Sequence, residues 1–133
     1  MLHIRGLVVE DPNGNERVRL GAPLPDPMIH GVRQKRAGAV SGLLISDANG
    51  NERGGYVTSD TPGDAFITLD SEDDQEVMLL ANRKGGANFY LSDKGNLAQM
   101  TVFAGESDQV PDGPKLTMRK AKQTILELPA TQK

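Results

Sequence analysis

The chain has 133 residues, fifteen glycines, eight prolines and a formal net charge of -3, which is the length of one domain and the composition of a turn-rich fold. This mildly acidic balance gives no support for binding to nucleic acids or to anionic membranes. Because the sequence contains no cysteine, disulfides, thiolate catalysis and cysteine-ligated metals are excluded. No cofactor is expected.

The N-terminal segment has only a short apolar run around residues 7–9 before charged residues begin. A secretory signal needs about 7–15 consecutive apolar residues, and a membrane-spanning helix needs about 20. We therefore expect a cytoplasmic protein, with leaderless export left open.

Five segments of the chain align with one another, which predicts a serial repeat. In the first four, an aspartate ends an apolar run and opens a polar stretch, and a second apolar run follows. These aspartates, Asp11, Asp47, Asp70 and Asp93, are 36, 23 and 23 residues apart. The segments are LVVEDPNGNERVRLGA (7–22), LLISDANGNERGGYVT (43–58), FITLDSEDDQEVMLLA (66–81), FYLSDKGNLAQMTVFA (89–104) and, more loosely, LTMRKAKQTILELPA (116–130).

Each repeat is expected to form a β-hairpin. In the first repeat, Val8 and Val9 precede the tip, and the alternation in RVRL places Val18 and Leu20 on one side of a strand. The tip sequence DPNG favours a turn, because Asp11 can accept bonds from the backbone ahead of it and the glycine accepts a positive φ. The near-identical heptads DPNGNER and DANGNER are therefore interpreted as one turn used twice.

The same heptads carry oxygen-bearing side chains at alternate positions, as in the first half of a calcium-binding loop. Such a loop has glycine at its sixth position and glutamate at its twelfth. The first heptad has Glu16 and Ala22 at these positions, and the second has Glu52 and Thr58. The turn is favoured over a calcium site, and no metal site is predicted.

An insertion at residues 23–41 lengthens the first spacing. Its alternating prolines cannot donate hydrogen bonds to a sheet, and basic side chains follow them. We interpret it as a covering strap or an intersubunit arm, with contact to a ligand or a protein partner as the alternative. The candidate binding residues are His30, Arg33, Lys35 and Arg36 in this insertion, together with Tyr56.

The last repeat is open to two interpretations. Met118, Ala121, Ile125 and Leu128 have helical spacing, but the same stretch fits a hairpin with KAKQ at its tip. The parallel with the other repeats favours the hairpin. Two glycine pairs, at 54–55 and 85–86, lie outside any strand–helix unit, so they are expected to allow a bulge or a close backbone approach and not to bind phosphate.

Two tips carry opposite charge. The third tip, DSEDDQE, holds five acids, and the last holds Arg119, Lys120 and Lys122. Solvated tips are the first interpretation. The alternative is that acidic and basic tips meet between subunits and set the register of an assembly, which predicts salt-sensitive oligomerisation.

The phrases LVVEDPNGNERVRLGAP, SGLLISDANGNERGGY and AFITLDSEDDQEVMLLAN resemble a loose group of uncharacterised bacterial repeat proteins that alternate apolar arms with Asp-x-x-Gly-x-x-Arg tips. The likeness spans most of residues 4–106. The third and fourth repeats depart from the motif, with Asp73 and Asn96 where the glycine would stand. The resemblance implies a β-hairpin architecture and supplies no catalytic residues.

We expect a single all-β domain over residues 1–133, with about ten short antiparallel strands in serial hairpin repeats that form a barrel or a two-sheet sandwich. Serial hairpins with few aromatic residues leave apolar surface at the ends of the array, which predicts a symmetric homo-oligomer, with a trimer preferred. The favoured function is a structural or interaction module without a catalytic site. The alternatives are a small-ligand or ion-binding barrel lined by Arg33, Arg36 and Tyr56 and, third, a hydrolase or isomerase that uses carboxylates and His30.

Overall fold

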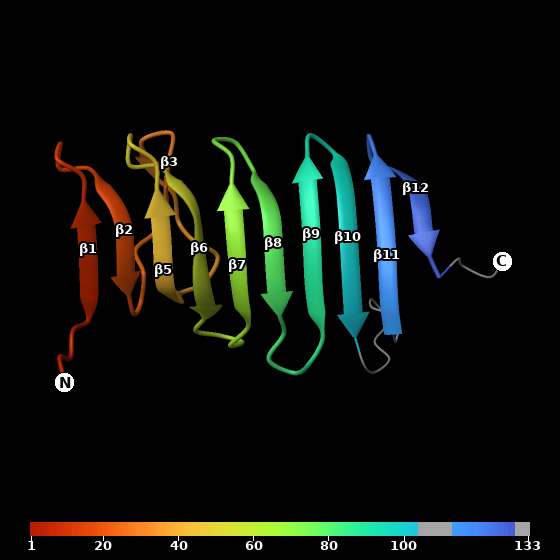
Figure 1. The fold of residues 1–133 in the computed structure, drawn as a ribbon, viewed down its shortest axis with the longest axis horizontal. Helices are drawn as coiled ribbons and strands as arrows, with labels where there is room; N and C mark the ends of the chain where they lie inside the picture. Colours follow the sequence, from red (N-terminus) through yellow and green to blue (C-terminus); the bar gives the residue numbers. More distant parts are fainter. Residues whose placement is uncertain (104–112, 130–133) are drawn as a thin grey trace.

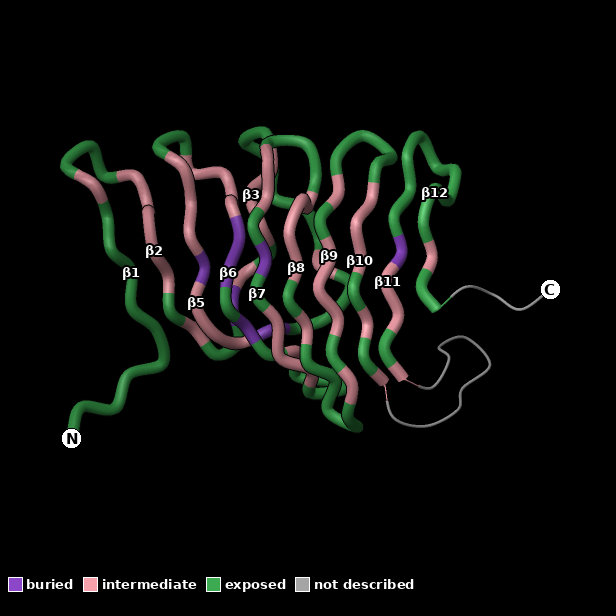
Figure 2. Tube along the Cα trace, turned by 45° about the vertical axis from the view of Figure 1, so that its right-hand side comes forward, coloured by how far each residue is buried: buried purple, intermediate pink, exposed green. Residues whose placement is uncertain are grey.

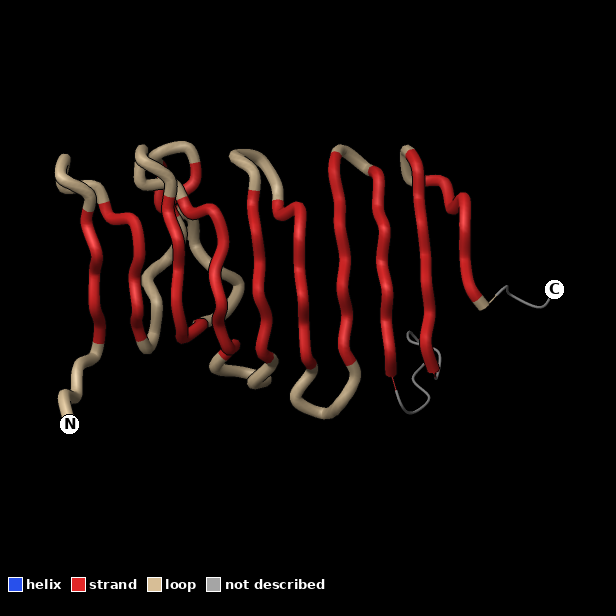
Figure 3. Tube along the Cα trace, in the orientation of Figure 1, coloured by secondary structure: helices blue, strands red, loops and turns tan. Residues whose placement is uncertain are grey.

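The fold is known from a computed structural model, which describes residues 1–103 and 113–129. These residues form twelve β-strands and no helix (Figure 3). Ten strands make one antiparallel sheet, and the other two pair as a small separate hairpin. The strands of the large sheet are β1 (Gly6–Glu10), β2 (Glu16–Gly21), β5 (Val40–Ser46), β6 (Glu52–Ser59), β7 (Ala65–Asp70), β8 (Gln75–Ala81), β9 (Ala87–Asp93), β10 (Asn96–Phe103), β11 (Gly113–Lys120) and β12 (Gln123–Leu128), and the small hairpin is β3 (Met28–Ile29) with β4 (Val32–Arg33).

The predicted all-β fold of about ten antiparallel strands in serial hairpins is confirmed. The described strands of the large sheet form one open sheet, so the expected barrel or two-sheet sandwich is not confirmed. The last repeat forms the hairpin β11–β12, so the helical interpretation of that stretch is wrong. Ala104 and Ala130, which end two of the expected repeats, lie outside the described residues.

Strands that follow one another in sequence are neighbours in the sheet, except where the insertion separates β2 from β5 (Figure 1). Over the described residues the sheet is open, with β1 at one edge and β12 at the other. All five hairpin tips lie along one side of the sheet, and the β6–β7 and β8–β9 connections lie along the opposite side (Figure 1). The insertion starts at that opposite side, and its β3–β4 hairpin reaches the tips of β5–β6 and β7–β8. We call these sides the tip side and the connection side.

A small core lies on one face of the sheet, beneath the insertion. Leu24 of the insertion packs against Val40 and Leu44 of β5 and Val57 of β6, and Phe66 of β7 flanks them. The backbone N–H of Leu24 donates to the carbonyl oxygen of Val40 at 2.8 Å, which fixes the insertion to the first residue of β5. Apart from one position on β11, the buried positions gather on β5, β6, β7 and the insertion (Figure 2). The insertion is therefore a strap that covers part of one face, and we call residues 23–39 the strap.

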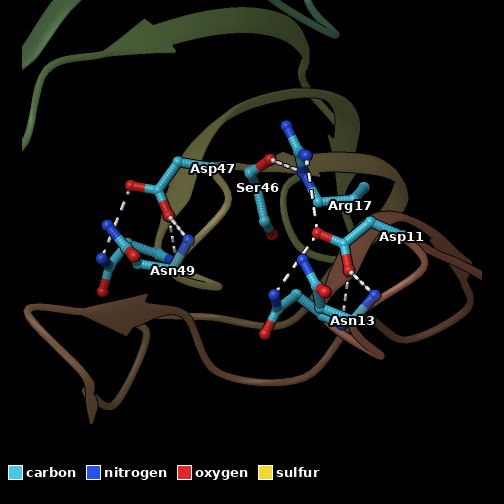
Figure 4. A network of polar contacts seen from close by, with 8 residues as sticks. Asp11, Asn13, Arg17, Ser46, Asp47 and Asn49 are labelled. Atoms are coloured by element: carbon cyan, nitrogen blue, oxygen red, sulfur yellow. Dashed lines mark hydrogen bonds and ion pairs between the residues drawn. The ribbon is translucent and has the colours of Figure 1, made fainter.

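The two near-identical heptads form near-identical tips (Figure 4). Oδ1 of Asp11 accepts the backbone N–H groups of Asn13 and Asn15 at 2.9 and 3.0 Å, and Asp47 accepts those of Asn49 and Asn51 at 2.8 and 3.0 Å. The hydrogen bond from Asn15 is the main cause that lowers the pKa of Asp11. These aspartates therefore cap turns, and the prediction that one turn is used twice is confirmed.

Candidate interaction surface

The second face of the sheet is apolar along its whole width. Residues directly opposite in an antiparallel pair project from the same face, so the strand registers connect one row of side chains across all ten strands. Every member of this row is a large apolar or aromatic residue. We call it the central row: Leu7, Leu20, Leu43, Tyr56, Ile67, Leu79, Phe89, Met100, Leu116 and Leu128.

Two further rows of the same face flank the central row, because side chains two residues apart on a strand share a face. The row nearer the hairpin tips has aliphatic side chains that are on average smaller than those of the central row, and the row nearer the connections has mainly small ones. The tip row is Val9, Val18, Ile45, Gly54, Leu69, Val77, Leu91, Ala98, Met118 and Leu126; the small row is Ser41, Thr58, Ala65, Ala81, Ala87, Val102 and Pro114.

This apolar face is open to solvent in the single chain. Tyr56 is 62% exposed, Met100 55% and Leu79 47%, and every other member of the central row is exposed or half-exposed. The change from large to small side chains leaves a hollow of about 520 Å³ between the central row and the small row. From the strand spacing and rise, the face measures about 45 Å by about 20 Å, or roughly 900 Å². The largest apolar patch of a typical monomer is about 300–600 Å².

The opposite face carries polar side chains over β9, β10 and β11. Asn88, Gln99, Thr101 and Thr117 project from this face of β9, β10 and β11. Oδ1 of Asn88 accepts hydrogen bonds from Nε2 of Gln99 at 3.1 Å and from the Thr101 hydroxyl at 3.2 Å. These side chains line a hollow of about 670 Å³, together with four cationic residues, one carboxylate and several apolar residues. The cationic residues are Arg83, Lys84, Lys115 and Arg119, the carboxylate is Asp64, and the apolar residues include Leu80 and Phe103.

The structure separates the candidate binding residues that the sequence suggested. His30, Arg33, Lys35 and Arg36 all lie on the strap, whereas Tyr56 belongs to the central row on the other face. Arg33 donates to the carbonyl oxygen of Asp26 at 2.6 Å, inside the strap itself. Lys35 is exposed and makes no ion pair with any described residue. Tyr56 therefore shares no pocket with the strap residues.

Arg36 holds the strap to the sheet electrostatically. Its guanidinium forms an ion pair with Glu52 at the start of β6, and its backbone N–H donates to Oδ1 of Asp26 at 3.0 Å. Burial raises the pKa of Glu52, and the charge of Arg36 opposes that rise. Arg36 is thus a structural residue of the strap.

Asp70, at the end of β7, lies in the same region. Burial, together with the negative charge of Glu52, raises the pKa of Asp70 to about 6. Its Oδ1 is buried and accepts no hydrogen bond from the described residues. Asp70 is therefore not part of a solvated tip, although its neighbours in the acidic tip are.

His30 occupies the turn of the β3–β4 hairpin, where its φ is +49°. Its Nε2 lies 3.2 Å from Oδ1 of Asp73 in the acidic tip, and the two side chains are 57% and 86% exposed. The contact joins the strap to the tip of β7–β8 at the molecular surface. Both groups are open to water, so they do not form an enclosed acid–base pair.

Within residues 1–103 and 113–129, no group of three or more histidine, aspartate or glutamate side chains is placed to hold a metal ion. The same part of the chain contains no helix long and apolar enough to cross a membrane. Comparisons with protein-family models, with curated proteins and with solved structures find no match for this chain.

Sequence reasoning looked for polar binding residues and missed the apolar face. A signal for it was present: in NFYL, QMT and LTM, large apolar residues alternate with polar ones, and the alignment of the repeats brings these positions into one row. The insertion is expected from the sequence to be a covering strap or an intersubunit arm, but its contribution of Leu24 to the core has no sequence signal beyond one apolar residue between prolines.

Proposed function

We propose that this protein is a structural module that assembles with further copies of itself through the apolar face. The observation that supports the proposal is the central row, a continuous strip of exposed large apolar side chains across ten strands. A stable protein–protein interface buries about 800 Å² on each partner, and the face offers roughly 900 Å². Another copy would then supply the second apolar layer that a β-fold of this kind needs.

The test of self-association is a charge placed on the apolar face. Met100→Lys puts an ammonium group into the central row, where burial against a second copy would leave it unpaired. We expect wild type to be an oligomer by light scattering at micromolar concentration, and Met100→Lys to shift to single chains with an unchanged far-ultraviolet spectrum.

The matched control is Gln99→Lys, because Gln99 is the neighbouring residue on the same strand and projects from the opposite face. This variant should keep the oligomer mass of wild type. Wild type that remains a single chain over the whole concentration range would refute the proposal.

A second candidate function is the binding of a small anion in the hollow of the polar face. Four cationic side chains and one carboxylate, Asp64, line this hollow with hydroxyl and amide groups. The excess of cationic groups is the chemistry that recognises phosphate or carboxylate groups. Of these cations, Lys115 already has a partner, with its Nζ 3.3 Å from Oε2 of Glu127.

Pyrophosphate titrated into the protein in a calorimeter tests this candidate. We expect saturable binding that Arg119→Gln weakens about tenfold, the loss of about one charge-assisted contact. Lys120→Gln, one residue further along β11 and outside the hollow, should bind as wild type does. Heats equal to those of dilution would remove the candidate.

A further inference from the structure

We infer that three copies of the chain assemble into a triangular prism in which each sheet forms one side and the strands run across the prism axis. This inference rests on the proposed self-association and specifies its geometry. All three apolar faces point to the axis, and the three straps lie on the outside. The contacts are of the head-to-tail kind, in which the tip side of one copy meets the connection side of the next, and a three-fold rotation closes the ring.

The length of the strands favours three copies. Strands of 5 to 8 residues give each side of the prism a length of about 20 Å. The axis of a triangular prism of that size lies about 6 Å from each sheet, close to the 5 Å that is half the spacing of two packed sheets. A four-sided prism would place the axis about 10 Å from each sheet and leave a hollow centre that aliphatic side chains do not fill.

The width of the sheet decides how the strands run. If the strands ran along the axis, each side of the prism would be about 45 Å wide, and the axis would lie about 13 Å from every sheet. Leu and Ile side chains do not reach so far, and close-packed interiors tolerate few voids. Strands that cross the axis avoid this problem, because the ten strands then stack along the length of the prism.

The order of side-chain size across the face matches a triangular section. In such a section the space over the middle of each side is the deepest, and it narrows toward the corners where two sheets converge. The large central row lies at the middle of the strands, and the small row lies at the connection side. Two sheets packed face to face keep a uniform spacing, which gives no reason for such a gradient.

The corners are complementary as well. At each corner the small row of one copy meets the tip row of the next, so that Ala81 and Ala87 face side chains such as Val77 and Leu91 of the neighbour. The hollow of about 520 Å³ along the small row is the space that these aliphatic side chains fill. Small side chains packed against larger aliphatic ones fill the corner without voids or steric overlap.

The absence of cysteine in the natural chain allows a direct test by cross-linking. Ala87→Cys/Leu91→Cys places one thiol in the small row and one in the tip row of β9. The two positions are about 13 Å apart on one strand, too far for a disulfide within a chain, whose Cα atoms must lie within about 7 Å. In the prism, the thiol at position 87 of each copy lies opposite the thiol at position 91 of the neighbouring copy. We expect mild oxidation to link three chains covalently, seen on a non-reducing denaturing gel, and the native particle to have the mass of three chains.

Asn88→Cys/Ser92→Cys is the matched control, with the same strand and spacing on the outward face, and it should give no covalent trimer. A two-chain mass with linkage that stops at two chains would overturn the prism and leave self-association standing. A three-chain mass without covalent trimers would overturn the corner arrangement. A single-chain mass would overturn both the prism and the proposed function.

Discussion

Gly54, at the tip side of the apolar face, marks a place where two strands approach each other too closely for any side chain. Its φ is +132°, and a Cβ atom there would overlap the carbonyl oxygen of Thr68 on β7. We expect Gly54→Ala to lower the free energy of unfolding by about 1–3 kcal/mol, because backbone strain adds to the steric overlap. Urea unfolding at one protein concentration measures the loss. Gly38→Ala is the control, since nothing lies within 4 Å of its added Cβ, and an equal effect of both substitutions would contradict the explanation.

Asp70 gives the fold a dependence on pH. Its pKa is about 6 in the folded chain against an ordinary value of 3.8, so the folded state binds its proton more tightly. Between these values the folded state carries more protons than the unfolded state, and stability falls as pH rises. Asp70→Asn is neutral at every pH, so the free-energy penalty of ionising this side chain in the folded state is absent. We expect it to leave the free energy of unfolding nearly unchanged at about pH 3.5 and to raise it by about 1–2 kcal/mol at about pH 7.5, a figure reduced for partial exposure.

Urea unfolding at the two pH values measures this difference, and Asp93→Asn, at an exposed tip position, should show no such dependence. A gain for Asp70→Asn of the same size at both pH values would mean that ionisation of Asp70 does not cause it.

The sequence alone could predict the capping role of Asp11 and Asp47, because their partners lie within four residues. It could not predict the state of Asp70, because the strap and Glu52 that surround it come from distant parts of the chain.

At the scale of elements, the strap stabilises the sheet through one side chain more than through its many charges. Leu24 is only 6% exposed, and it closes the core over β5 and β6. We expect Leu24→Ala to lower the free energy of unfolding by about 2–5 kcal/mol, the cost of an apolar group lost from a buried site. Val32→Ala, at a strap position that is 61% exposed, should cost far less. If the two substitutions had equal effects in thermal unfolding, the strap would not be part of the core.

The hairpins could be predicted from the sequence because their information is local. The turn residues of DPNG and DANG and the apolar arms beside them specify each hairpin within about sixteen residues, and five hairpins in series follow from the repeat. Which face the strap covers is not local information. It depends on Leu24 meeting Leu44 and Val57, whose side chains project from the face opposite to the central row. Because the strap packs on that opposite face, the apolar face that carries the central row stays open.

At the scale of the whole molecule, the placement of the charged tips bears on how copies meet. The acidic tip of β7–β8 and the basic tip of β11–β12 lie on the same side of one sheet (Figure 1). In a head-to-tail prism the tip side of each copy meets the connection side of the next, so the acidic and basic tips of different copies do not face one another. The hypothesis that opposite tips set the register of assembly is therefore not favoured by this geometry.

The dependence of assembly on salt separates the two modes of contact. At about 1 M salt the Debye length is about 3 Å, which removes attraction between exposed tips, whereas apolar burial persists. We expect the particle mass from light scattering to be the same in low and in molar salt, because the contact surface is made mainly of apolar side chains and carries no charged residue. Dissociation in molar salt would instead support the hypothesis that copies meet through their acidic and basic tips. It would also mean that copies do not meet through the central row, since apolar contact between copies would have survived the loss of charge attraction.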